Sequence, residues 1–300
     1  MKVFLLTAIT MVAFAGNSLL CRLALETYHM DPASFTSIRL ISGALVLWVL
    51  TSRQKYLDTT NNNNSKKGNW LSAFALFTYA ACFSFAYVNL TTAMGALLLF
   101  GAVQVTMIGY GIFKGERLTY QQSTGLIIAI VGFGYLLWPG LSAPPFIASL
   151  TMITSGIAWG IYSLRGKGSG DPTMITSGNF LRSIPLTIAL NFLSYLYFQY
   201  TDTSMQFIMP ASIAAIISGA VTSGMGYALW YRVLPSLKST TAATVQLSVP
   251  VIAAFTGIIF LHESMSQHLL ISSLAILGGI ALVITKKHHE ISSPNVSNKN

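Results

Sequence analysis

The sequence predicts an all-α polytopic membrane protein with ten transmembrane helices, arranged as an inverted repeat of five plus five. Three observations lead to this fold class: the composition, ten apolar segments of spanning length, and a likeness between the two halves. Apolar residues make up 53% of the 300 residues and charged residues only 8%, whereas a soluble domain carries roughly 25% charged residues. A mean hydropathy of +0.62 agrees with a chain that lies mostly in lipid.

Ten segments are long and apolar enough to cross a bilayer, for which a helix needs about 20 residues. The first of them resembles a weak signal peptide, with Ala13-Phe14-Ala15 as a cleavage-like site. Its apolar run continues to Leu20, however, so we count it as a span. The ten predicted spans are Val3–Cys21, Ala33–Thr51, Asn69–Val88, Thr92–Phe113, Thr119–Trp138, Pro145–Leu164, Thr173–Gln199, Pro210–Tyr231, Thr240–Leu261 and Gln267–Thr285.

Basic residues indicate the orientation of these spans, because cytoplasmic loops collect Lys and Arg. With the N-terminus inside, fourteen of them fall on the cytoplasmic side and Arg22 alone falls outside. This bias predicts a multi-pass protein of a bacterial inner membrane with both termini cytoplasmic. It also accounts for the net charge of +9 without a nucleic-acid partner.

The two halves share motifs at similar spacing. "DPASFTSIR" from Asp31 resembles "DPTMITSGNFLR" from Asp171, and "GERLTYQQSTG" from Gly115 parallels "HESMSQHLLIS" from His262. Five spans is an odd number, so the second unit enters the membrane from the opposite side, as in many secondary transporters. We expect one five-helix repeat over residues 1–140, a second over residues 141–287, and a disordered cytoplasmic tail over residues 288–300.

Several motifs resemble the EamA-like permeases of the drug/metabolite transporter superfamily. "VPVIAAFTGIIFLHESMS" from Val249 matches the family's proline-containing span and its loop with Glu. "VQVTMIGYGIFKGERLT" matches it too, with Val103 in the proline position, and "AWGIYSL" from Ala158 resembles the family's tryptophan-glycine motif. The resemblance implies a small-molecule substrate and a lipid environment, and it leaves monomer and homodimer open.

Polar and aromatic side chains inside the spans are candidates for a substrate cavity, which is usually apolar with a few fixed polar groups. In the family, the cavity is built by spans one, three, four, six, eight and nine. That resemblance selects a set of candidates, although any single aromatic residue is more often a packing residue or an interface anchor. The candidates are Asn17, Tyr79, Gln104, Trp159, Tyr162, Tyr227 and Gln246.

Two arginines lie within predicted spans. Arg39 is about six residues into its span, near enough to an end to snorkel to the outer interface. Arg182 is about nine residues in, close to the centre of a core about 30 Å thick. Each is expected either to be satisfied structurally, by snorkelling or by backbone carbonyls, or to act as a gate or cavity cation that attracts a carboxylate.

Two prolines are expected to kink their helices, because a proline cannot donate its backbone hydrogen bond. Pro185 would free the carbonyl of Leu181, next to Arg182, and the long seventh span could break there. Pro250 would free the carbonyl of Gln246, which places a backbone acceptor beside a polar side chain.

The function predicted from these features is export of small metabolites, such as amino acids or related amphiphiles, by alternating access. All eight acidic residues lie in loops, tails or span ends, so proton coupling through a central carboxylate is not expected. Walker A, HExxH, GxSxG and CxxC motifs are absent, so we expect neither an enzyme nor a cofactor or metal. The alternatives are an importer or exchanger of nucleotide-sugar or organic-phosphate type, or a membrane protein without transport activity.

Overall fold

The computed structural model describes residues 2–57, 68–113, 115, 119–138, 143–166, 170–201, 208–237 and 245–284. The expected tail at 288–300 lies outside the described residues, as do Glu116 and most basic loop residues. Regular secondary structure in the described part of the chain is helical throughout. The protein is therefore all-helical in this part, as the sequence predicts.

The first half of the chain forms five helical runs. They are α1 (Lys2–Arg22) continued by the π-helix η1 (Leu23–Thr27), α2 (Pro32–Leu57), α3 (Trp70–Tyr87), α4 (Thr92–Phe113) and α5 (Tyr120–Leu136). α5 begins with a capping box. The Thr119 hydroxyl accepts a hydrogen bond from the Gln122 backbone N–H, and the Gln122 side-chain oxygen accepts one from the Thr119 backbone N–H.

The second half forms a similar series. It consists of α6 (Phe146–Arg165), α7 (Pro172–Thr201), α8 (Met209–Ile217), the π-helix η2 (Ser218–Met225), α9 (Gly226–Val233), the 3₁₀ turn η3 (Leu234–Ser236), α11 (Ser248–Leu261) and α12 (Gln267–Ile284). α8, η2 and α9 follow one another without a break and together make up the eighth predicted span.

The repeated sequence motifs form equivalent helix starts. The Asp31 carboxylate accepts from the Ser34 backbone N–H at 2.8 Å, and that of Asp171 accepts from the Met174 N–H at 2.8 Å. Each aspartate thus satisfies one of the free N–H groups of the first turn. The same local sequence therefore starts α2 and α7 in the same way.

Six helical runs are long and apolar enough to cross a membrane. They are Val3–Thr27, Pro32–Arg53, Trp70–Tyr87, Thr92–Phe113, Phe146–Arg165 and Met209–Ser236, with Ser248–Leu261 and Gln267–Leu282 as shorter apolar helices. Large apolar side chains point outward along them, for example Phe113 at 85% exposed and Ile147 at 79%. Such a surface suits lipid, so the protein is a multi-pass membrane protein.

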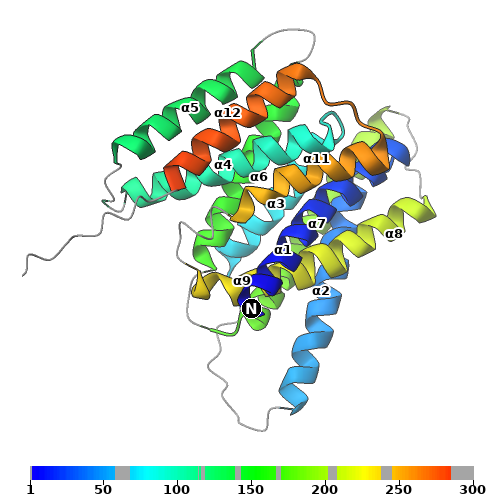
Figure 1. Ribbon diagram of the computed structural model, residues 1–300. Coiled ribbons are helices and arrows are strands. Elements are labelled where there is room, and N and C mark those ends of the chain that lie inside the picture. Colours follow the sequence, from blue (N-terminus) through cyan, green and yellow to red (C-terminus); the bar gives the residue numbers. More distant parts are fainter. Residues whose placement is uncertain are drawn as a thin grey trace, which may run out of the picture.

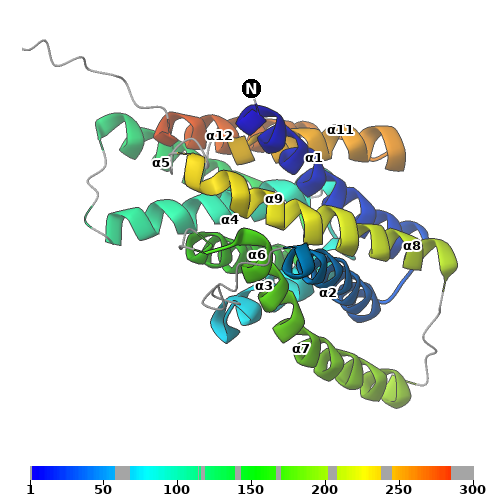
Figure 2. The same cartoon turned by 90° about the horizontal axis from the view of Figure 1, so that it is seen from below.

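The helices pack into a bundle in which distant segments are neighbours. α12 lies along α5 at one side of the molecule, and α4 packs against both α6 and α11 (Figure 1). α2 packs against α7 and η2, whereas α1 packs against α9 and α11. α1 packs against the continuous run of α8, η2 and α9, and Figure 2 shows the two next to each other from below.

The two prolines lie at different places in their helices. α7 is helical from Pro172 to Thr201 with Pro185 inside it, so the helix does not break there, and a kink at Pro185 stays a prediction. Pro250 lies in the first turn of α11, where the N–H groups have no intrahelical partner to lose. The helical conformation is interrupted just before it, at Leu247.

A close backbone approach brings η2 onto α2. A Cβ added at Gly219 would lie 2.0 Å from both the Arg39 carbonyl oxygen and the Ser42 Oγ. Only glycine fits at that distance. This contact positions the residues that follow on η2 and α9 opposite the Arg39 side chain.

Candidate functional site

Arg39 donates hydrogen bonds to several side chains of a polar cluster that is buried in the bundle. Its side chain is 0% exposed. Its Nε donates to Ser223 Oγ at 2.9 Å, and its Nη2 donates to the hydroxyls of Tyr79 at 3.0 Å and Tyr227 at 2.7 Å. The expectation that Arg39 snorkels to the outer interface is therefore wrong, because helices of both halves enclose the guanidinium.

Hydroxyl and amide groups continue this cluster. Tyr227 and Tyr79 share a hydrogen bond between their hydroxyls at 3.0 Å, and Asn17 Nδ2 donates to Tyr79 at 3.2 Å. The Asn17 Oδ1 accepts from the hydroxyls of Ser218 and Thr222. We call Asn17, Arg39, Tyr79, Ser223 and Tyr227 the central cluster; its members come from α1, α2, α3, η2 and α9.

Aromatic rings surround the central cluster. The Arg39 Cζ lies 5.1 Å from the ring centroid of Tyr79 and 4.9 Å from that of Phe83, which is cation–π distance. The Trp159 ring is 4.8 Å from Tyr79 and 4.7 Å from Tyr227, centroid to centroid. Polar groups and an apolar wall thus share one buried region, as in small-molecule sites.

The charge of Arg39 has no carboxylate to balance it in the described part of the chain. The ion pairs found there are made by Arg22, and the Nη1 of Arg39 has no hydrogen-bond partner. Burying a guanidinium in this way costs several kcal/mol unless a counter-charge arrives. The central cluster therefore holds a cation with an open donor group.

The other predicted cavity residues lie around this cluster to different degrees. Tyr162 contacts the Trp159 ring at 5.6 Å and stacks on Tyr231 at 5.2 Å. The Trp159 Nε1 donates to Gln246 Oε1 at 3.5 Å. Gln104 is fully buried on α4, and its link to the cluster stays a prediction.

Arg182 occupies a different environment from Arg39. It is half-buried on α7, and its Nη1 donates to the carbonyl of Gly178 at 2.9 Å, one turn back in the same helix. This bond corresponds to the carbonyl-bonded alternative, although the carbonyl is that of Gly178 and not that of Leu181.

Sequence reasoning missed two partners of Arg39, Ser223 on η2 and Phe83 on α3. Ser223 lies in the run "SGAVTSGM", whose small and hydroxyl residues form the π-helix. Polar residues within a predicted span, together with glycines, are a signal for such a bulge, and π-bulges are frequent at functional sites. Phe83 carries no such signal, because nothing local distinguishes it from a packing residue.

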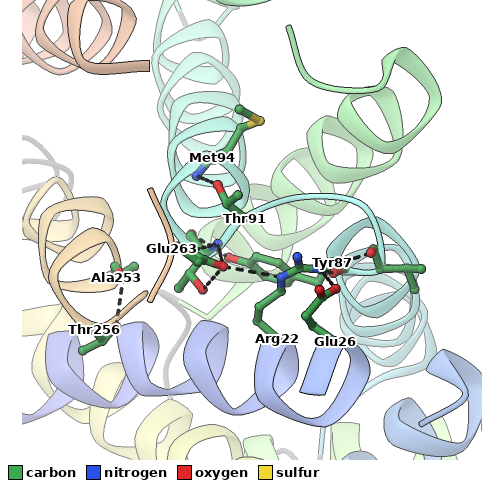
Figure 3. A network of polar contacts seen from close by, with 10 residues as sticks. Arg22, Glu26, Tyr87, Thr91, Met94, Ala253, Thr256 and Glu263 are labelled. Carbon is green, nitrogen blue, oxygen red and sulfur yellow. Dashed lines mark hydrogen bonds and ion pairs between the residues drawn. The ribbon is translucent and has the colours of Figure 1, made fainter. Parts of the chain in front are cut away.

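A second polar network, at the C-terminal end of α1, forms around Arg22 and Glu263 (Figure 3). The Glu263 carboxylate accepts from the Thr92 N–H at 2.8 Å and from the Thr92 hydroxyl at 3.1 Å, so it caps α4. Arg22 pairs with Glu263 at 3.4 Å and with Glu26 at 3.0 Å. Its Nη1 also donates to the carbonyl of Tyr87 at 2.9 Å. This network joins the ends of α1, α3, α4 and α11.

Comparisons with known proteins agree on a transporter family. The model of the EamA-like transporter family matches residues 146–285. An uncharacterized protein of Pseudomonas aeruginosa is 46% identical, covering 95% of this chain and 96% of the relative. An uncharacterized transporter of Archaeoglobus fulgidus is 24% identical over 96% of this chain and 99% of its own length.

Two further likenesses extend over most of the chain. A probable amino-acid metabolite efflux pump of Salmonella typhimurium is 23% identical and covers 92% of both chains. A protein of known crystal structure is 16% identical with a TM-score of 0.61, over 92% of this chain and 96% of that chain, and shares the fold. The chain belongs to the EamA-like transporter family of the drug/metabolite transporter superfamily.

Proposed function

We propose that the protein is a secondary transporter that exports small metabolites by alternating access, with the central cluster as its substrate site. Ten transmembrane helices would form two inverted repeats, residues 1–140 and 141–287, in a bacterial inner membrane with both termini cytoplasmic. Amino acids or related amphiphiles are the candidate cargo. The name of the Salmonella relative, a probable amino-acid metabolite efflux pump, agrees with this direction and cargo.

The helix contacts support the inverted repeat. α5 packs on α12, α2 on α7, and α4 on α11, so each of these helices packs on its own counterpart in the other half. The contacts between different helices also occur in equivalent pairs. α3 packs on α6, and the counterpart of α3, α9, packs on the counterpart of α6, α1. In the same way α4 packs on α6, and its counterpart α11 packs on α1. A two-fold relation between two five-helix units would produce this set of pairs.

The single observation that carries the proposal is the convergence of both halves on one buried cluster. Arg39 and Tyr79 belong to the first half, whereas Ser223 and Tyr227 belong to the second, and hydrogen bonds join them. A site shared by two units can open to either side of the membrane when the units rock against each other. Asn17, Trp159, Tyr162, Gln104 and Gln246 would line or support it.

The alternatives differ in what they require of the site. A carrier of nucleotide sugars or organic phosphates would need several basic residues to balance its substrate, and the central cluster contains Arg39 alone. An exchanger of other solutes on the same fold remains the second candidate, because direction depends on gradients and not on the fold.

Counterflow in proteoliposomes tests the proposal. Vesicles loaded with an unlabelled solute should accumulate the same labelled solute only when they contain the protein. Tyr79→Phe with Tyr227→Phe should reduce that uptake, whereas Tyr120→Phe, at an exposed position on α5, is the matched control. Equal uptake in the double variant and wild type would remove the central cluster from the transport pathway.

A further inference from the structure

The donors and acceptors of the central cluster do not balance. Arg39 Nη1 has no acceptor among the described residues. Three donors, from Asn17, Arg39 and Tyr227, lie within hydrogen-bonding distance of the Tyr79 oxygen, which has only two lone pairs to offer. The Tyr79–Tyr227 pair has two phenol protons and one mutual hydrogen bond, so one of these protons also lacks an acceptor among the described residues. Ser223 accepts from Arg39 and has no acceptor for its own proton in the described region. A surplus of donors around a cation selects a ligand group that is rich in acceptors and negative.

We propose that the central cluster binds the carboxylate of a solute whose net charge is −1 and whose body is apolar or aromatic. This inference rests on the transport proposed for that site, and it narrows the cargo from amino acids and related amphiphiles to those relatives that carry a carboxylate and no ammonium group. A carboxylate is planar, accepts from two donors of a guanidinium at once, and also accepts phenol protons. Nη1 and the open hydroxyl protons around the guanidinium supply donors for it.

The net charge of the solute follows from the single cation. A monoanion neutralises Arg39 and leaves the buried region neutral. A zwitterion brings an ammonium group, and no carboxylate of the described chain reaches the cluster to receive it, since the ion pairs there belong to Arg22. A dianion such as a phosphate monoester leaves one uncompensated negative charge in a medium of low dielectric constant.

The aromatic wall accounts for the body of the solute. Phe14 contacts the rings of Trp159 at 5.4 Å and Tyr227 at 5.7 Å, and Trp159 and Tyr227 border Tyr79 in turn. A carboxylate held at Arg39 therefore has rings beside it on α1, α6 and α9. Aromatic side chains give an apolar body large contact areas.

Four probes with one phenyl body and different head groups test the inference: phenylpyruvate, phenylalanine, phenethylamine and phenyl phosphate. Binding is measured as the rise in the thermal unfolding midpoint of the purified full chain in detergent, and transport as counterflow in proteoliposomes. We expect phenylpyruvate to give the largest rise. Its affinity should fall about 30-fold or more in Arg39→Gln, as when one partner of a buried charged pair is removed.

Three variants keep the test decisive. Arg39→Lys retains the charge but not the planar fork, so binding should weaken while phenylpyruvate stays the preferred probe. Tyr227→Phe removes one hydroxyl and should weaken binding by about tenfold; both variants serve if Arg39→Gln does not fold. Arg182→Gln tests the rival arginine: loss of phenylpyruvate binding there, with binding kept in Arg39→Gln, overturns the assignment.

The two readouts separate the inference from the function on which it rests. Arg39-dependent stabilisation by phenylpyruvate without counterflow of any probe supports the carboxylate site and contradicts transport. Counterflow that favours phenethylamine or phenylalanine, or that is unchanged in Arg39→Gln, overturns the site and leaves transport standing. Absence of stabilisation by phenylpyruvate up to millimolar concentration also overturns the inference.

Discussion

Arg39 and Arg22 are both enclosed by the bundle, but of the two only Arg22 has a counter-ion in the part of the chain that the structure describes. Arg22 lies between Glu26 and Glu263 and also donates to two backbone carbonyls. Within the described ranges, Arg39 has hydroxyls and ring faces around it and no carboxylate. An ion pair within the chain holds the ends of its helices together. A buried charge without a counter-ion carries an uncompensated desolvation cost, and a ligand of opposite charge lowers that cost when it binds. The comparison distinguishes Arg22, which the chain itself pairs, from Arg39, for which we propose a role in binding.

The largest expected effect on stability comes from the network of Arg22. Glu263→Ala removes the acceptor for the Thr92 N–H and hydroxyl and one partner of Arg22, with both charged side chains about nine-tenths buried. The free energy of unfolding should fall by about 2 kcal/mol, the cost of leaving such groups unpaired. Detergent titration measures it, and Glu263→Gln, which keeps an acceptor oxygen, is the control with a smaller loss. An unchanged midpoint would mean that the network does not hold these helix ends.

Arg39→Met should destabilise the protein less than Glu263→Ala does, and it should abolish the binding of phenylpyruvate. The substitution removes a buried cation with an unsatisfied Nη1, and the two tyrosine hydroxyls keep their mutual hydrogen bond. The free energy of unfolding should change by no more than about 1 kcal/mol, as when buried ionic groups are replaced by apolar ones. The same detergent titration measures the free energy of unfolding, and the binding assay measures the affinity for phenylpyruvate. A loss as large as that of Glu263→Ala would show that Arg39 is itself structural.

The smallest effect is expected for Glu26→Gln. Its side chain is 56% exposed, and Arg22 retains Glu263 and two carbonyls. Exposed ion pairs contribute at most about 1 kcal/mol, so the unfolding midpoint should barely move. A repeat at high salt checks the assignment, because screening should abolish what little difference remains. A shift comparable to that of Glu263→Ala would place Glu26 at the centre of the network.

Local patterns in the sequence were sufficient for the helices, because the signals act over short distances. Apolar runs of spanning length predicted segments that are helical in the described residues, from α1 to α12. The capping box at Thr119 and the aspartates at Asp31 and Asp171 act within one turn, so their effect is visible in the sequence itself. The bend that a proline produces depends on the helices packed around it, so the kink at Pro185, inside α7, stays a prediction.

The candidate site was only partly predictable, since its residues come from five separate helical segments. The sequence supplied Asn17, Tyr79 and Tyr227 as polar or aromatic groups within spans, and it noted Arg39 and Arg182 as arginines in lipid. It did not distinguish the two arginines. Depth along a helix favoured Arg182 as the unusual one, but burial depends on which face meets other helices, and the structure encloses Arg39 completely.

What the sequence by itself determined is an all-helical chain of the EamA-like transporter family with a resemblance between its halves. Composition, span length and repeated motifs are properties of segments, and each segment carries them alone. Only the tertiary structure decided which polar groups meet, because Gly219 lets η2 approach α2 and brings Ser223 and Tyr227 to Arg39. Whether a buried charge is balanced depends on groups far apart in the chain, and their distances are fixed only when the helices pack.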